Sequence, residues 1–257
     1  MKILVKIYAT FLTLILCTIY ISAQEYKVLV GQAEKILITK LDSKISIEGY
    51  DGNELIINVT NLEITPERTN GLKSLFDNRI DNTGIGLYYK IKNKLIEFTG
   101  LSRHSEDAEY VFLVPRNISV SIIRLGPNAH KNIIVKNING EIDVKTHYGD
   151  IEFYDITGPA VLYNIDGDIT GTFGKLNQEN PTSLTTINGF LDISLFADTK
   201  ANVKMNTSLG EIFTDLDIKY DIISQGVGGR AITGTLNGGG VDFFIAAINQ
   251  NIYLRKK

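Results

Sequence analysis

The chain has 257 residues, with 26 Lys or Arg against 29 Asp or Glu, and a formal net charge of −3 at pH 7. Hydrophobic residues make up 44% and charged residues 21%, a balance that excludes an intrinsically disordered chain. The sequence carries no basic patch of the kind that binds nucleic acid, so no nucleic-acid partner is expected.

The first 23 residues have the pattern of a signal peptide. Lys2 and Lys6 precede an apolar run over 7–21, and Ser22-Ala23-Gln24 offers a small-residue cleavage site. This run is shorter than the roughly 20 residues that a membrane span needs. We therefore expect a cleaved signal peptide over 1–23, with an uncleaved membrane anchor as the alternative, and no membrane span after cleavage. The protein would then be exported to the periplasm, the outer surface or the medium.

The single cysteine, Cys17, lies inside this apolar run. Lipidation of Cys17 is the less favoured interpretation, because Leu16 is not the small residue that a lipoprotein site needs. Cleavage near Ala23 leaves a mature chain without cysteine, so packing and strand pairing must stabilise it without disulfides.

Residues 24–131 alternate apolar and polar side chains in short segments, which predicts a β-rich N-terminal part. An irregular insertion is expected near 65–108, with a short helical segment at 71–78 and a polar loop at 102–108 that contains His104. Strands are predicted at 35–41, 44–50, 54–59, 86–91, 94–100, 109–115 and 118–125.

Residues 132–257 repeat a short motif: a glycine, an acidic residue, a β-branched residue and then a polar–apolar alternation. The motif reads NGEIDV at 139–144, YGDIEF at 148–153 and DGDITG at 166–171, with looser copies at 188–193, 209–214 and 238–243 and a final NQNIYL at 249–254. Its glycines are Gly140, Gly149, Gly167, Gly189, Gly210 and Gly239, at steps of 9, 18, 22, 21 and 29 residues.

A period near 20 residues is typical of stacked β-units, and glycine suits the corners between strands. We therefore predict an all-β fold, a single-stranded β-solenoid or β-helix of stacked short strands with glycine corners. Ile151 and Ile169 occupy matching places in two repeats, so both are expected in the core of neighbouring repeats. The longer step after Gly210 predicts a loop within 220–230.

Several segments together resemble a bacterial family of unknown function, labelled "putative adhesin" or β-strand-repeat protein and frequent in envelope proteins of Bacteroidetes-type bacteria. The segments that carry the resemblance are the signal ending in Ser-Ala-Gln, SKISIEGYDG, VFLVP, NINGEIDVKTHYGDIEF and the final NIYLRKK. The resemblance covers most of 26–257 and implies a single-stranded β-solenoid. It implies no catalytic residue, ligand or cofactor.

Outward-facing positions after the repeat glycines are rich in carboxylates. If repeats stack in register, ladders of like charge would form, and these indicate either a solvated face that discourages aggregation or a site for a cation or basic partner. Calcium is not favoured, because a nine-residue step occurs only once. The two outward sets are Glu141, Asp150, Asp168, Phe190, Glu211 and Gly240, followed by Asp143, Glu152, Thr170, Asp192, Phe213 and Asp242.

His147, Tyr148, Asp150 and Asp168 form the candidate ligand patch, because they lie together on the most regular repeats. No GxSxG, HExxH or phosphate-loop motif appears, and no catalytic residue, metal site or cofactor is predicted. The glycines of 225–229 are expected to be loop glycines.

These observations predict an exported, non-catalytic β-repeat protein with an adhesin-like binding or structural role in the cell envelope. An envelope polysaccharide or a surface protein is the expected kind of partner. The alternative is a carbohydrate-active enzyme on a β-helix scaffold, in which Asp150 and Asp168 would be the carboxylates to test. A third alternative is an architectural component that self-associates through its end strands.

Overall fold

A computed structural model describes residues 24–63, 72, 80–101, 107–127, 129–226 and 229–257. This part of the chain contains twenty-one β-strands and no helix, which confirms the predicted all-β class. None of the described segments is therefore a helix able to cross a membrane. The predicted signal peptide with Cys17, the helical segment at 71–78 apart from Leu72, and His104 lie outside the described residues.

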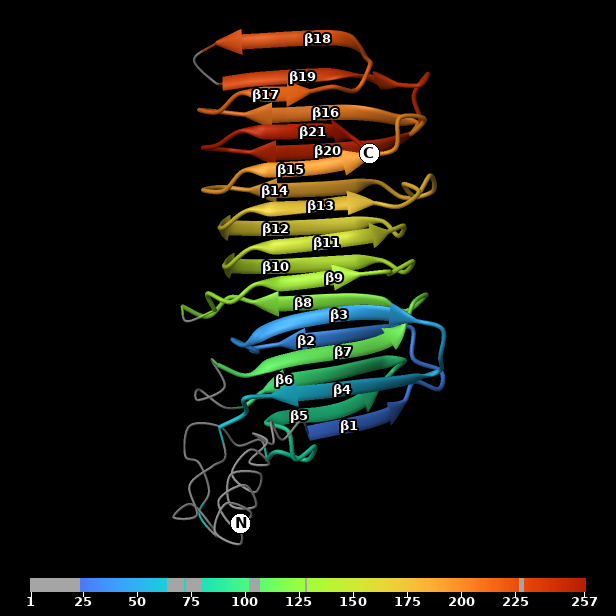
Figure 1. Cartoon of the computed structure of the whole chain (residues 1–257), viewed down its shortest axis with the longest axis vertical. Helices are drawn as coiled ribbons and strands as arrows, with labels where there is room; N and C mark the ends of the chain where they lie inside the picture. Colours follow the sequence, from blue (N-terminus) through green and yellow to red (C-terminus); the bar gives the residue numbers. More distant parts are fainter. Residues whose placement is uncertain (1–23, 64–71, 73–79, 102–106, 128, 227–228) are drawn as a thin grey trace, which may run out of the picture.

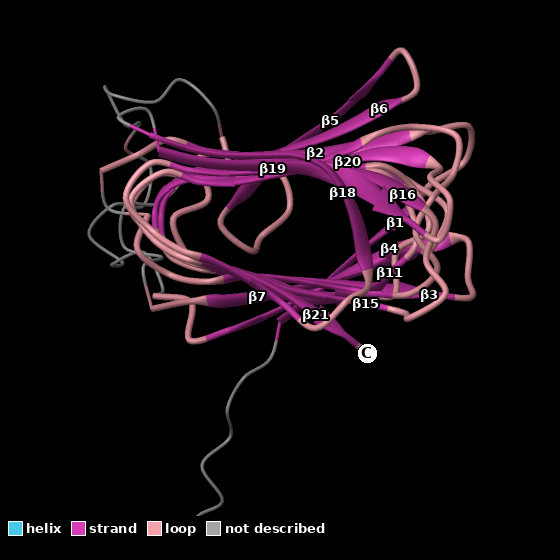
Figure 2. Ribbon diagram, turned by 90° about the horizontal axis from the view of Figure 1, so that it is seen from above, coloured by secondary structure: helices cyan, strands magenta, loops and turns pink. Residues whose placement is uncertain are grey.

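The strands form two mixed sheets that face each other across the core (Figure 2). Within the described residues, sheet A has the order β1-β4-β7-β3-β9-β11-β13-β15-β21-β17, and sheet B has the order β18-β19-β16-β20-β14-β12-β10-β8-β2-β6-β5. Sheet A consists of β1 (Gln24–Leu29), β3 (Lys44–Tyr50), β4 (Glu54–Thr60), β7 (Glu109–Pro115), β9 (Ile133–Lys136), β11 (Ile151–Ile156), β13 (Ile169–Phe173), β15 (Leu191–Leu195), β17 (Ile212–Thr214) and β21 (Ile252–Lys256). Sheet B consists of β2 (Lys35–Thr39), β5 (Leu87–Lys92), β6 (Leu95–Gly100), β8 (Ser119–Arg124), β10 (Ile142–Tyr148), β12 (Ala160–Asp166), β14 (Thr182–Thr186), β16 (Ala201–Thr207), β18 (Ile218–Gly226), β19 (Gly229–Leu236) and β20 (Val241–Ala247).

From β8 to β15 the chain crosses between the sheets after every strand. Each strand pairs in parallel with the next strand of its own sheet, so that β8, β10, β12 and β14 are neighbours in sheet B and β9, β11, β13 and β15 in sheet A. One strand of sheet B and the following strand of sheet A make one layer, which we call a rung (Figure 1). The stack of rungs buries the inward side chains of both sheets.

The core contains the alternate apolar residues that the sequence places inward. Ile151 and Ile169 are paired across β11 and β13 and both are fully buried, as predicted. The aromatic rings of Phe153, Phe173 and Phe243 continue through the core, with centroid distances of 4.9 Å and 5.8 Å between successive rings. Because successive rungs are in register, each inward side chain packs on its equivalents in the adjacent rungs.

The repeat glycines lie at two different corners of the rungs. Gly149, Gly167, Gly189 and Gly210 lie where the chain passes from sheet B to sheet A, whereas Gly140 lies where it returns from sheet A to sheet B. A step of 18 to 22 residues is therefore a full rung, and the single step of 9 residues is half of one. Gly239 differs from the others, since it belongs to the turn before β20, and Gln250 lies at the β20–β21 corner.

At the sheet B to sheet A corner, the glycines allow consecutive rungs to approach closely. A Cβ atom on Gly189 would lie 1.9 Å from the carbonyl oxygen of Gly167, and one on Gly167 would lie 2.5 Å from that of Gly149. No side chain fits at such distances, so glycine is required there by packing between rungs.

The rungs do not stack in chain order. The rung β2–β3 lies between β6–β7 and β8–β9, because β2 pairs with both β6 and β8 and β3 with both β7 and β9. The C-terminal rung β20–β21 is likewise inserted, between β14–β15 and β16–β17. The C-terminus therefore lies within the stack (Figure 1).

The prediction of a loop within 220–230 is wrong, since the described residues of this segment belong to strands. β18 and β19 form an antiparallel hairpin that pairs with β16 through β19 and ends sheet B. The long glycine step arises because the chain leaves the stack after β17, forms this hairpin and then returns as β20. Gly226 and Gly229, which were expected to be loop glycines, are the paired last and first residues of β18 and β19.

Candidate functional site

The predicted ligand patch lies at the sheet B to sheet A corner, where Asp150 and Asp168 occupy equivalent places on adjacent rungs. Both carboxylates accept backbone hydrogen bonds from the next rung. The Asp168 N–H donates to Asp150 Oδ1 at 2.9 Å, and the Phe190 N–H donates to Asp168 Oδ1 at 3.0 Å. Each carboxylate therefore pairs a corner N–H group that would otherwise lack a partner.

The amide of Asn132 performs the same task one rung earlier, because its Oδ1 accepts the Asp150 N–H at 3.3 Å. Asn251 Oδ1 accepts the Glu211 N–H at 2.8 Å further along the stack. The position thus needs an oxygen acceptor rather than a negative charge. Burial raises the pKa of Asp168, the bond from the Phe190 N–H lowers it, and the nearby charge of Asp150 raises it, with a net upward shift.

Asp168→Asn is therefore expected to be at least as stable as the wild type at pH 7. The raised pKa means that the stabilising contribution of Asp168 is present at low pH and is lost as the pH rises through the folded-state pKa. Asparagine keeps the oxygen acceptor and removes the charge. The free energy of unfolding should rise by no more than about 1 kcal/mol, because solvent screens the partly exposed carboxylates of Asp150 and Asp168.

Urea unfolding of both proteins across the carboxyl titration range would check this result, since the difference should vanish under acidic conditions. Asp168→Ala is the matched control and should lose about 1 kcal/mol with the acceptor. Equal destabilisation of the asparagine and alanine variants at pH 7 would contradict the interpretation.

Tyr148 of the predicted patch contacts two histidine rings, His147 within the patch and His130, which the sequence did not connect to it. The centroid of the Tyr148 ring lies 4.8 Å from the centroid of the His130 ring and 6.3 Å from the centroid of the His147 ring. The Tyr148 carbonyl oxygen points inward and accepts hydrogen bonds from Arg124 Nη2 at 3.0 Å and Thr146 Oγ1 at 2.8 Å.

Arg124 anchors this corner from inside the molecule. Its guanidinium is fully buried and also donates to the carbonyl oxygens of Ser43, at 3.2 Å, and Lys131. Burial lowers the pKa of Arg124 to about 10, while the nearby charge of Asp42 raises it. The alternation Val120, Ile122, Arg124 was the sequence signal that this arginine faces the core.

The predicted ladder of carboxylates is interrupted. Glu152 and Asp192 share the outer face of sheet A but are separated by Thr170 on the intervening strand. Asp143 and Asp242 lie on sheet B, the opposite sheet. The structure brings no group of three or more His, Cys, Asp or Glu side chains into metal-binding proximity among the residues it describes.

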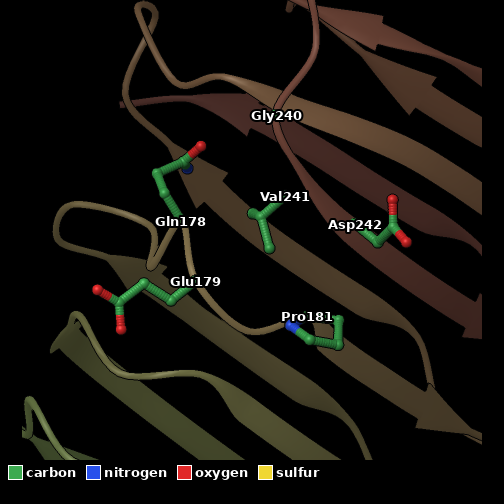
Figure 3. Close-up of a pocket in the computed structure, with 6 residues that line it drawn as sticks. All are labelled: Gln178, Glu179, Pro181, Gly240, Val241 and Asp242. Atoms are coloured by element: carbon green, nitrogen blue, oxygen red, sulfur yellow. The ribbon is translucent and has the colours of Figure 1, made fainter.

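Two shallow hollows occur at the surface of the described residues. The first has a volume of about 320 Å³ and lies beside the starts of β14 and β20, where Glu179 and Asp242 point away from each other (Figure 3). The second lies on the outer face of sheet A between β9 and β11. There the Tyr154 hydroxyl donates to Glu152 Oε2 at 2.9 Å, and the Lys136 ammonium lies 5.6 Å from the Tyr154 ring centroid.

An exposed group of aromatic and charged side chains lies on the outer face of sheet A near its β17 edge. We call it the aromatic patch, and it consists of Phe190, Asp192, Phe213, Tyr253 and Arg255. The Phe213 and Tyr253 rings are stacked, with centroids 5.4 Å apart and planes 11° apart, and Phe190 meets Tyr253 edge-on at 6.1 Å. Phe213 is 49% exposed.

The charges of the aromatic patch compensate each other. Arg255 forms a bidentate ion pair with Asp192, at 2.6 Å and 3.0 Å, and its guanidinium lies 5.3 Å from the Tyr253 ring centroid. In the described part of the chain no strand of sheet A lies beyond β17, and Phe213, whose ring stacks on Tyr253 on one side, is about half exposed. The patch thus offers a free aromatic face beside paired polar groups.

The sequence held a signal for the aromatic patch. Phe190 and Phe213 stand in the two outward series at positions where most other repeats have acidic residues. The outer face is therefore aromatic at these two repeats. The third ring could not be placed from the sequence, because Tyr253 reaches its position between them only through the inserted rung β20–β21.

No known family model matches the chain, and no curated protein matches it. Among solved structures, a "putative cell adhesion protein" from Clostridium sporogenes is similar at 12% identity and a TM-score of 0.49, over 92% of this chain and 99% of that one. A "putative lipid binding protein" from Parabacteroides distasonis is similar at 11% identity and a TM-score of 0.32, over 91% of this chain and 97% of that one. Both likenesses are too distant to assign a function.

Proposed function

We propose that the protein is an exported, non-catalytic β-repeat protein with an adhesin-like role in the cell envelope, and that the aromatic patch is its binding surface. The signal-peptide pattern of 1–23 supports export. The alternation of strands between two sheets, with parallel pairing one rung later, supports describing the fold as a single-stranded β-solenoid.

The observation that carries the binding proposal is the free ring face of Phe213 beside the Asp192–Arg255 pair. Aromatic and arginine side chains contribute most of the binding energy at many recognition surfaces, and a half-exposed phenylalanine on a flat sheet is available without rearrangement. The contacts of Asp150 and Asp168 support a structural role for these two carboxylates, since each already accepts a backbone N–H.

A polysaccharide of the envelope is the partner that this chemistry fits best. The ring face can cover the apolar face of a sugar, and the Asp192 carboxylate and Arg255 guanidinium can bond to hydroxyl groups at its rim. Because their charges cancel, the patch suits an uncharged polymer better than a strongly acidic or basic one.

Binding of the mature chain, residues 24–257, to isolated envelope polysaccharides and to whole cells would test the proposal. Phe213→Ala is expected to weaken binding about tenfold, because it removes the exposed ring. Tyr154→Ala is the matched control, since Tyr154 is also exposed on the outer face of sheet A but lies outside the aromatic patch. Equal binding by the Phe213 variant and the wild type would show that the patch is not the binding surface.

The same experiment separates the alternatives. Binding to cells that is lost after protease treatment of the cells, without binding to polysaccharide, would identify a surface protein as the partner. Release of new reducing ends by the wild type but not by Asp150→Asn or Asp168→Asn would instead establish the carbohydrate-active enzyme.

A further inference from the structure

The free edge of sheet B at the β18 end carries apolar side chains on both of its faces. Among the strands that the structure describes, β18 is the last of sheet B, so one of its edges has no neighbour in the sheet. Tyr220, Ile222 and Ile223 in this strand are 46%, 59% and 66% exposed. Sheet B has two further strands, β19 and β18, beyond β16. Sheet A ends at β17, which forms one rung with β16. The hairpin therefore projects past the end of sheet A (Figure 1).

The edge strands at the other end of the stack each expose one large apolar side chain, Ile91 on β5 and Leu29 on β1, whereas β18 exposes three beside its charged Lys219 and Asp221. β5 ends sheet B with Lys90 and Lys92 on either side of Ile91, and β1 ends sheet A with Glu25 and Lys27. Charged residues, lysine above all, are the usual means by which edge strands avoid pairing with other chains. The two ends of the stack thus differ, and the apolar one is suited to being covered.

The residues of β18 can be assigned to the two faces of sheet B from their partners in β19. Tyr220 and Ile223 lie opposite Gly234 and Ile232, which lie beside the buried Val203 and Met205 of β16, so both point to the inner face. Ile222 lies opposite Thr233 and points to the outer face. A bulge at Asp221 separates the two halves of the strand.

We propose that two copies of the chain associate end to end by antiparallel pairing of their β18 strands about a two-fold axis. With Tyr220 of one copy opposite Ile223 of the other, the axis passes between Asp221 and Ile222. Inner residues then meet inner residues, and both bulges lie at the axis. The strand segments on either side of the bulges therefore remain in register.

This register is self-complementary in charge and in shape. Lys219 lies opposite Ser224 of the second copy and Asp221 lies opposite Ile222, so no like charges lie directly opposite each other, and the two Asp221 side chains lie on either side of the axis. The Tyr220–Ile223 contact forms twice, and such aromatic–aliphatic cross-strand pairs stabilise antiparallel sheets. A closed two-fold contact of this kind also consumes the edge, which prevents further strand addition there.

The dimer extends the proposed function without depending on it. The pairing uses the edge of sheet B, whereas the aromatic patch lies on the outer face of sheet A at the same end of the stack, so the two patches would lie on either side of the junction. Two patches on one rod would raise the apparent affinity for a repetitive polymer, because the second binding event becomes intramolecular.

Sedimentation velocity on residues 24–257, over roughly 1 to 200 µM, tests the dimer without any ligand. The wild type is expected to show a concentration-dependent dimer, and Ile223→Lys should raise its dissociation constant at least about tenfold by placing a charge at the edge. Ile91→Lys, on β5 at the opposite end and 52% exposed, should dimerise like the wild type. Circular dichroism melting of each variant shows that the fold is kept.

A monomeric wild type throughout this range would overturn the inference, as would an Ile223→Lys variant that dimerises unchanged. Loss of the dimer in Ile91→Lys alone would place the contact at the other end and equally refute it. Binding to polysaccharide by a monomer would leave the proposed function intact, so the two failures can be told apart.

Cross-linking tests the register itself, because residues 24–257 contain no cysteine. The double variant Tyr220→Cys, Ile223→Cys places the thiol at 220 of each copy opposite the thiol at 223 of the other, within disulfide reach. It should form a covalent dimer on non-reducing gels, whereas Ile223→Cys alone should not. A double variant that stays monomeric on the gel, while the wild type dimerises in solution, would refute pairing through β18 in this register.

Discussion

Ile151→Asp is expected to destabilise the protein by about 4 kcal/mol or more, a large part of the stability of an ordinary domain. Ile151 is fully buried and pairs with Ile133 and Ile169 in the neighbouring rungs. The substitution removes a packed side chain and places a carboxylate without a hydrogen-bond partner in the core between the two sheets.

Glu152→Gln is the matched control, since the neighbouring residue points to the opposite face of the same strand. Its side chain is partly exposed. The glutamine oxygen can accept from the Asn132 amide while the glutamine amide donates to the Tyr154 hydroxyl, so the effect should stay within about 0.5 kcal/mol. Urea denaturation of the two variants would measure the difference. Equal midpoints would mean that Ile151 does not face the core.

Gly189→Ala is expected to cost about 3 kcal/mol, although it adds only one methyl group. The new Cβ would lie 1.9 Å from the Gly167 carbonyl oxygen and 2.4 Å from its carbon, both of them backbone atoms that cannot rotate away. The two rungs would have to separate at this corner. Their strands β13 and β15 are paired over their length, so the separation would strain the ladder on both sides.

Gly226→Ala is the control for the glycine prediction, because a Cβ at that position meets no atom within 4 Å. Thermal unfolding should show a clear drop in Tm for the Gly189 variant and little change for the Gly226 variant. An unchanged Tm for Gly189→Ala would show that the corner can open, and that glycine is not required there by contact between rungs.

Part of the candidate site could be derived from the sequence. Asp150 and Asp168 lie on adjacent rungs, where the Asp168 N–H donates to Asp150, because equal positions in adjacent repeats lie one strand apart. Their task could not be derived, since the N–H groups that they bind belong to the turns of the following rungs. The aromatic patch needed the structure for a similar reason, because Phe190, Tyr253 and Phe213 meet only after the C-terminal rung is inserted between the other two.

The sequence by itself determined many of the strands and the direction of their side chains. Alternation of polar and apolar residues is a local property with a period of two, so it shows which side of a strand faces the core wherever that strand lies. This is why Ile151, Phe153 and Ile169 were placed inward correctly.

The tertiary structure alone decided which rungs became neighbours. All parallel rungs with the same alternation offer nearly the same surface to one another, so the local pattern does not distinguish the chain order from an inserted order. The choice depends on contacts between distant residues, such as Phe173 against Phe243 and the buried Arg124 against carbonyl groups of Ser43 and Tyr148. For the same reason the segment at 220–230 became an edge hairpin instead of a loop, since β19 pairs with the open side of β16 and β18 pairs with β19.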